Sequence, residues 1–84
     1  MSILIEDDPS PELLAELGYA PDEPLFGLYV GVPLPQRTFG EAPPLPDHIL
    51  LFRRPLQRAC RTRQALREQI RITVLHELGA LLRL

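Results

Sequence analysis

The first quarter of the chain alternates short apolar runs with turn-forming residues. The run from Ser2 to Ile5 is apolar and β-prone, and three acidic residues and Pro9 follow it, so a short first strand is predicted there. Ser10 can accept the free N–H groups of a helix start, and an apolar stripe of three leucines runs from there to Gly18. A short helix is therefore predicted to end at Gly18.

Two further apolar runs flank a proline-rich segment. Phe26 to Val30 predicts a second strand and His48 to Phe52 a third, because both runs are short and rich in β-branched or aromatic residues. Residues 32 to 47 between them are predicted to form an irregular surface loop. Pro55 then opens a short helical turn that continues to Cys60.

The last part of the chain has the period of one long helix. Thr62 is a suitable cap for a helix from Arg63 to about Arg83. At about 100° per residue, one face of this helix gathers apolar residues that are expected to form the core. They are Leu66, Ile70, Val74, Leu78 and Leu81, with Leu75 and Leu82 widening the face. Arg63, Arg67 and Arg71 follow one flank, which is expected to be solvated.

These elements predict a single α+β domain over residues 1 to 84, with a small sheet of about three strands packed on the long C-terminal helix. The hydrophobic content of 45% and the charged content of 24% are those of a folded domain rather than a disordered chain. No stretch approaches the roughly 18 apolar residues of a membrane helix, and the acidic start does not resemble a signal peptide. We therefore expect a cytoplasmic protein without a membrane partner.

The net charge of −2 conceals an uneven distribution. Residues 1 to 48 carry nine acidic residues against Arg37, a balance of −8, whereas residues 49 to 84 carry eight arginines against Glu68 and Glu77, a balance of +6. The two halves could face each other within the fold, or the basic half could bind nucleic acid or an acidic partner. The acidic first half and the shortage of aromatic residues argue against nucleic acid, which is not an expected partner.

Glu77 does not fit the apolar face of the last helix, although the helical projection places it there, within roughly 40° of Ile70. A buried carboxylate must bind a proton, pair with an arginine or line a water-filled site. With His76 it forms the start of the zinc-peptidase motif H-E-x-x-H, in which histidines at i and i+4 face one metal and the glutamate is the general base. The fifth position here is Ala80, which has no donor atom.

Two other side chains could act as metal ligands. His48 could do so if its strand packs against the helix, although an ordinary strand residue is the more economical interpretation. Cys60, which as the single cysteine excludes an internal disulfide, is more typical of a small buried apolar residue. A partner chain could also supply ligands.

Three segments in order resemble the small bacterial zincin-like metallopeptidase family of otherwise uncharacterised proteins. They are Gly27 to Leu34, Asp47 to Leu56, and Arg67 to Glu77, which reads REQIRITVLHE. The resemblance implies a minimal zincin-like fold, with His76 as a vestigial metal ligand and Glu77 as a vestigial general base. In the family a second histidine stands at the position of Ala80, an acidic third ligand follows, and an additional helix comes first. The chain is thus expected to be a degenerate member, shortened at both ends.

We therefore expect a protein without standard zinc-peptidase activity that binds another protein or a peptide, of unknown identity, through its sheet edge or cleft. No cofactor is expected, although zinc is possible. The alternative is a zinc-dependent peptidase with a non-standard or partner-supplied ligand set. Self-association is possible, because a domain of this size buries only part of its apolar surface.

Overall fold

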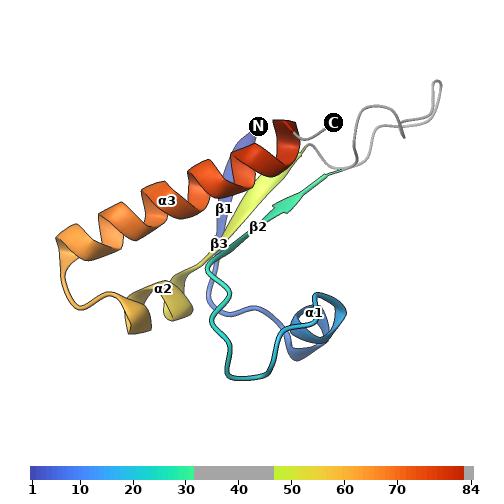
Figure 1. The fold of residues 1–84 in the computed structure, drawn as a ribbon, viewed down its shortest axis with the longest axis horizontal. Helices are drawn as coiled ribbons and strands as arrows, with labels where there is room; N and C mark the ends of the chain where they lie inside the picture. The colour runs from blue at the N-terminus through green and yellow to red at the C-terminus, as the bar shows by residue number, and fades with distance from the viewer. Residues whose placement is uncertain (32–46, 83–84) are drawn as a thin grey trace.

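A computed structural model describes residues 1 to 31 and 47 to 82 of the chain. For residues 80 to 82 it describes the helical backbone only. Figure 1 shows the elements in chain order. They are β1 (Ser2–Glu6), α1 (Pro11–Glu16), β2 (Gly27–Val30), β3 (His48–Phe52), α2 (Arg53–Ala59) and α3 (Arg63–Leu82). Residues 32 to 46 of the loop predicted over residues 32 to 47 lie outside the described residues.

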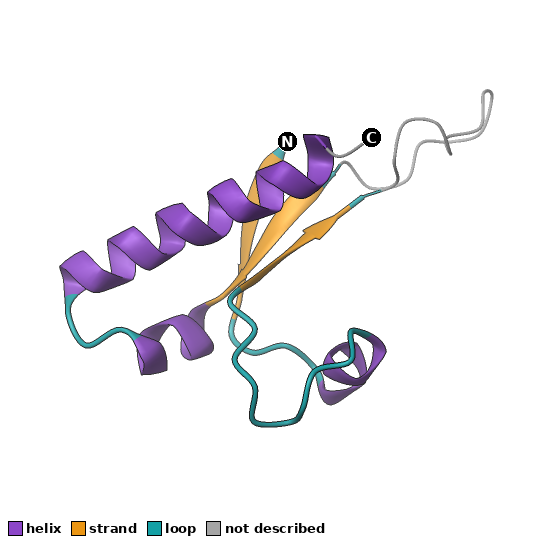
Figure 2. Ribbon diagram, viewed as in Figure 1, coloured by secondary structure: helices purple, strands orange, loops and turns teal. Residues whose placement is uncertain are grey.

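The three described strands form one mixed sheet in the order β1-β3-β2. β1 pairs with β3 in parallel, and β2 pairs with β3 antiparallel, so the third strand along the chain lies in the middle. Figure 2 shows the long helix α3 running across the strands, and it packs against β2 and β3. The predicted α+β class, a three-stranded sheet on a long C-terminal helix, is confirmed.

The core lies between β3 and α3. Ile49 and Leu51 of β3 are 1% and 5% exposed, and Leu56 of α2 closes the end of the cluster at 3% exposure. The partly buried residues packed on this cluster are Phe26, Leu66, Ile70, Val74 and Leu78. The predicted apolar face of α3 is thus confirmed for four of its members, and the side chains of its last turn lie outside the described part.

Leu75 was expected to widen this face, and that expectation is wrong, because its side chain is 55% exposed. The physical reason is the width of the sheet. Leu75 projects about 120° from the centre of the apolar arc. A three-stranded sheet covers only the side of the helix that faces it.

The two predicted N-terminal helix caps, Ser10 and Thr62, are present in the structure. The Ser10 hydroxyl accepts a hydrogen bond from the Leu13 N–H at 3.1 Å, and the Thr62 hydroxyl accepts one from the Ala65 N–H at 3.0 Å. α2 starts at Arg53, two residues before the proline expected to open it. A proline has no N–H to donate, and the first turn of a helix has no intrahelical acceptor for one, so Pro55 fits the third position as well as the first.

Charges from the two halves of the chain meet beside β1. The Arg53 guanidinium binds the Asp7 carboxylate at 2.7 Å, and Arg54 and Arg58 both contact Asp8. The hydrogen bond from Arg53 holds the pKa of Asp7 below its usual range. The interpretation that the acidic and basic halves face each other is confirmed at these pairs. No described helix is both long and apolar enough to cross a membrane.

Candidate functional site

The His-Glu pair lies where α3 crosses β2. Thr73 and Glu77 are one helical turn apart and therefore face the same strand. The backbone of Gly27 approaches this part of the helix so closely that a Cβ atom there would lie 2.7 Å from the Thr73 methyl carbon. β2 and α3 are thus in direct contact at the site, and Thr73 is buried at 7% exposure.

Glu77 binds the backbone of the neighbouring strand. Its Oε2 atom accepts a hydrogen bond from the Tyr29 N–H at 3.0 Å. β2 is an edge strand, and the Phe52 N–H donates to the Phe26 carbonyl at 2.9 Å on its inner side. Because backbone groups alternate along an antiparallel strand, the Tyr29 N–H points to the outer edge, away from β3. Glu77 therefore accepts a hydrogen bond from an amide on the outer edge of the strand.

This contact answers the question of why an acid lies on an apolar helix face. From the sequence, the Glu77 carboxylate was expected to bind a proton, pair with an arginine or line a water-filled site. In the structure its hydrogen-bond partner is a backbone amide. Glu77 is half-buried and lines an open cavity. A charge-assisted hydrogen bond of this kind compensates part of the cost of removing a carboxylate from water.

A second contact holds Tyr29 in place. Its phenolic hydroxyl donates a hydrogen bond to the Asp47 carboxylate at 2.8 Å, directly before β3 begins. The side chain of Tyr29 is therefore fixed to the central strand while its amide is fixed to α3. These two contacts position the edge strand relative to the helix.

His76 lies at the mouth of a cavity of about 220 Å³ between β2 and α3. The cavity is lined by Tyr19, Pro24, Leu25, Phe26, Gly27, Gln69, Ile72, Thr73, His76 and Glu77. The residues before α3 that line it are mostly apolar, and α3 contributes the imidazole and the carboxylate. His76 is exposed, so it is accessible to a ligand in the cavity.

The residues that the structure describes do not fit a catalytic zinc ion. Such an ion takes three protein ligands and keeps one open position, yet in the described segments no three His, Cys, Asp or Glu side chains gather for a metal. His48 lies on the other face of the sheet, because it alternates with Ile49, whose side chain packs beneath α3. Cys60 precedes the start of α3, whereas His76 lies about 20 Å along that helix.

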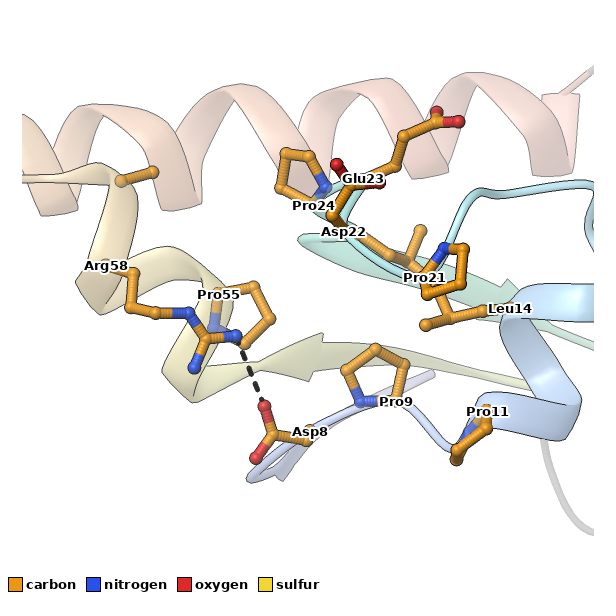
Figure 3. Close-up of a pocket in the computed structure, with 12 residues that line it drawn as sticks. Asp8, Pro9, Pro11, Leu14, Pro21, Asp22, Glu23, Pro24, Pro55 and Arg58 are labelled. Carbon is orange, nitrogen blue, oxygen red and sulfur yellow. Dashed lines mark hydrogen bonds and ion pairs between the residues drawn. The ribbon is translucent and has the colours of Figure 1, made fainter.

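A larger hollow of about 580 Å³ lies between α1, α2 and the segment before β2 (Figure 3). Its wall is lined by Asp8, Pro9, Pro11, Leu14, Pro21, Asp22, Glu23, Pro24, Leu25, Pro55, Arg58 and Ala59. The contact between Asp8 and Arg58 crosses one end of it. These lining residues include no histidine or cysteine, so the candidate functional site is the cavity beside Glu77.

Sequence reasoning found His76 and Glu77 but missed their neighbours on β2. Tyr29 acts through its backbone amide, which every residue except proline possesses, so its side chain gave no signal. Gly27 did give one, since a glycine within a strand indicates close backbone approach. The sequence could not show that α3 is the element that approaches.

The described residues form an α+β domain in which a helix with a His-Glu pair lies across the edge strand of a small sheet. That arrangement is the framework of zincin-like domains. The family model described as "Zincin-like metallopeptidase" matches residues 1–83, and the chain belongs to this family. No curated protein matches the chain.

The hydrogen bond between Glu77 and Tyr29 predicts a local change in amide exchange. In Glu77→Ala, the Tyr29 amide is expected to exchange about tenfold faster, since losing a hydrogen bond to a charged group is equivalent to roughly 1.5 kcal/mol or more. In Glu77→Gln the carboxamide oxygen can still accept, so exchange should remain near that of the wild type. Hydrogen–deuterium exchange followed by NMR measures both variants.

The neighbouring Leu28 amide is the internal control, because it faces β3 in the ladder and depends only on the stability of the sheet. Equal acceleration at Leu28 and Tyr29 would mean that Glu77→Ala loosens the whole domain rather than this contact.

Proposed function

We propose that the chain binds an extended peptide along the outer edge of β2, beside Glu77, and that it does so without standard zinc-peptidase chemistry. The observation that carries this proposal is the position of the Glu77 carboxylate on an edge-strand amide at the side of an open cavity. An exposed sheet edge is a template for strand addition, and a cavity beside it supplies selection for a side chain.

The size of the cavity supports a peptide rather than a small molecule. At about 220 Å³ it is smaller than the roughly 300–1,000 Å³ of most small-molecule pockets. It is suited to a single side chain of a longer ligand. Leu25, Phe26 and Ile72 contribute apolar surface to its lining, which favours an aliphatic or aromatic side chain.

The edge of β2 supports the orientation of that peptide. By the same alternation that turns the Tyr29 amide outward, the N–H and C=O of Gly27 point to the outer edge. An added strand would pair there while its side chain enters the cavity between β2 and α3. A short row of backbone partners of this kind predicts weak, sequence-selective binding.

The residues available support the proposed lack of standard peptidase chemistry. Ala80 stands where the H-E-x-x-H motif has its second histidine, and alanine cannot bind a metal. A catalytic zinc ion takes three protein ligands, and in the described segments no three potential ligands gather beside His76. Glu77 is best described as a contact between helix and strand, and as a vestigial general base.

The second candidate is a zinc-dependent peptidase whose remaining ligands are non-standard or come from a partner chain. Family membership and the exposure of His76 favour it. In such an enzyme zinc would polarise a bound water molecule, and Glu77 would accept its proton. The zinc measurements described in the Discussion separate the two candidates.

Two similarly exposed residues on α3 test peptide binding. Ile72 is 48% exposed and lines the cavity, whereas Leu75 is 55% exposed and lies outside it. A random heptapeptide library selected on the wild type is expected to yield binders that lose their affinity for Ile72→Asp. The same binders should retain their affinity for Leu75→Asp, because that change leaves the cavity intact.

Fluorescence anisotropy with the selected peptides measures the affinities, and circular dichroism confirms that both variants are folded. A library that yields no binder contradicts the proposal. Binders that treat the two variants alike contradict it as well, because they would bind elsewhere on the chain.

A further inference from the structure

β1 is an unprotected edge strand. All five of its residues are exposed, including Ile3 at 52%, Leu4 at 46% and Ile5 at 69%. No charged residue interrupts the run from Ser2 to Ile5. Folded proteins usually protect sheet edges with charges, prolines or bulges, so an exposed apolar edge indicates a surface for association.

The side chains of β1 lie on both faces of the sheet. Ile3 and Ile5 are in register with Ile49 and Leu51, the core residues beneath α3, so they point to the face that carries the helix. They remain exposed because α3 packs over β2 and β3. Leu4 points to the opposite face, so the two faces of the strand are both apolar.

The backbone of β1 also has groups available for pairing. The hydrogen bond from the Phe52 N–H to the Phe26 carbonyl shows that the backbone groups of Phe52, and of every second residue before it in β3, point towards β2. The backbone N–H and C=O groups of Ile49 and Leu51 therefore point towards β1. In the parallel register, their partners are the backbone groups of the even-numbered residues of β1. The N–H and C=O groups of Ile3 and Ile5 therefore point outward.

We propose that β1 binds β1 of a second copy of this chain, antiparallel and centred on Leu4, to form a two-fold symmetric dimer. In this register Ile3 of each copy lies opposite Ile5 of the other, and the two Leu4 residues lie opposite each other. Every outward backbone group of the two isoleucines then meets an outward group of the other copy. Antiparallel pairing of identical strands is the closed, isologous arrangement that small homodimers favour.

The sequence around Leu4 selects this register among the antiparallel ones. Ile-Leu-Ile reads the same in both directions, so all three aliphatic residues meet aliphatic residues. A register centred on Ile5 would place Leu4 opposite the Glu6 carboxylate and Ile3 opposite Asp7. A parallel pairing would instead place the two Glu6 side chains next to each other, where like charges repel.

The dimer also explains the exposed apolar surface of β1. Because the two-fold axis is perpendicular to the continuous sheet, both α3 helices lie on the same face, and the four isoleucines fill the space between them. The two β2 strands then lie at the two outer ends of the continuous sheet. The inference therefore does not rest on peptide binding at β2.

The oligomeric state tests the inference. Sedimentation equilibrium of the full chain is expected to give about twice the chain mass of 9.5 kDa at about 100 µM, because small edge interfaces associate weakly. Ile5→Lys places a charge in the interface and should give the single-chain mass. Ile5→Pro should do the same, because it removes an outward N–H without breaking a bond to β3. The control Ile72→Lys lies on α3 and should retain the doubled mass.

Disulfide trapping tests the register in a Cys60→Ser background. Cα atoms of directly opposed residues in a non-hydrogen-bonded antiparallel pair are about 4.5 Å apart, so Leu4→Cys is expected to cross-link two chains on mild oxidation. Ile3→Cys should not, since each Ile3 lies opposite Ile5. A wild type that keeps the single-chain mass at about 1 mM, or Ile5→Lys with the doubled mass, would overturn the proposal. Efficient cross-linking through Ile3→Cys but not Leu4→Cys would overturn its register.

Discussion

Gly27→Ala is expected to destabilise the domain by about 1 to 3 kcal/mol, although the substitution adds a single methyl group. The added Cβ would lie 2.7 Å from the Thr73 methyl carbon, 3.0 Å from the Leu50 carbonyl oxygen and 3.3 Å from a Leu51 methyl group. Two of these atoms belong to buried residues and the third to the backbone of β3. β2 must therefore shift away from α3. Urea denaturation measures the loss.

Thr73→Ser provides the specific rescue. Serine lacks the methyl group that the new Cβ would meet, and it retains the hydroxyl that accepts a hydrogen bond from Gln69 at 3.3 Å. The cost of Gly27→Ala should therefore be smaller in the Thr73→Ser background. An unchanged cost in that background would show that the contact with Thr73 does not require the glycine.

Gly79→Ala is the matched control. Gly79 lies in α3, and a Cβ atom built there meets nothing within 4 Å. Alanine is preferred over glycine within helices by about 1 kcal/mol, so this substitution is expected to stabilise the domain. Replacing glycine by alanine is thus expected to lower the free energy of unfolding at position 27 and to raise it at position 79.

The second large effect concerns zinc. Ala80→His is expected to bind zinc at least tenfold more tightly than the wild type, because it places an imidazole one helical turn after His76. Both rings can then reach one ion. Elemental analysis after purification without chelators, and competition with a chromophoric chelator, measure the gain. Adding His76→Ala to this variant should abolish it.

The wild type itself separates the two candidate functions. A wild type without bound zinc, beside an Ala80→His variant that binds it, would contradict a complete zinc site within this chain. A wild type with about one zinc per chain, lost in His76→Ala, would establish a non-standard ligand set. Peptide cleavage that Glu77→Gln abolishes would then identify a zinc-dependent peptidase.

The structure changes the interpretation of Glu77 more than that of any other residue. The helical projection correctly placed its carboxylate on the side of α3 that faces the protein. The projection could not identify the donor, because the Tyr29 amide is 48 residues away in sequence. An edge strand supplies such a donor wherever it passes, without any characteristic side chain.

Local signals determined the elements of this protein. The third strand was predicted with the bounds that β3 has in the structure, and Ser10 and Thr62 cap the helices that follow them. These features depend on residues within one or two turns of each other, so the sequence contains all the information they need. The apolar period of α3 likewise predicted which four of its described residues pack on the core.

The tertiary structure alone decided the order of the strands and the surroundings of the site. The parallel pairing of β1 with β3 joins segments more than 40 residues apart, and it places β1 at an exposed edge of the sheet. The isoleucines of β1 are exposed at this edge, and Leu75, which was expected on the core face of α3, is exposed as well. Hydrophobic patterns specify which side of an element is apolar, whereas the width of the sheet and the path of α3 determine which apolar sides are covered.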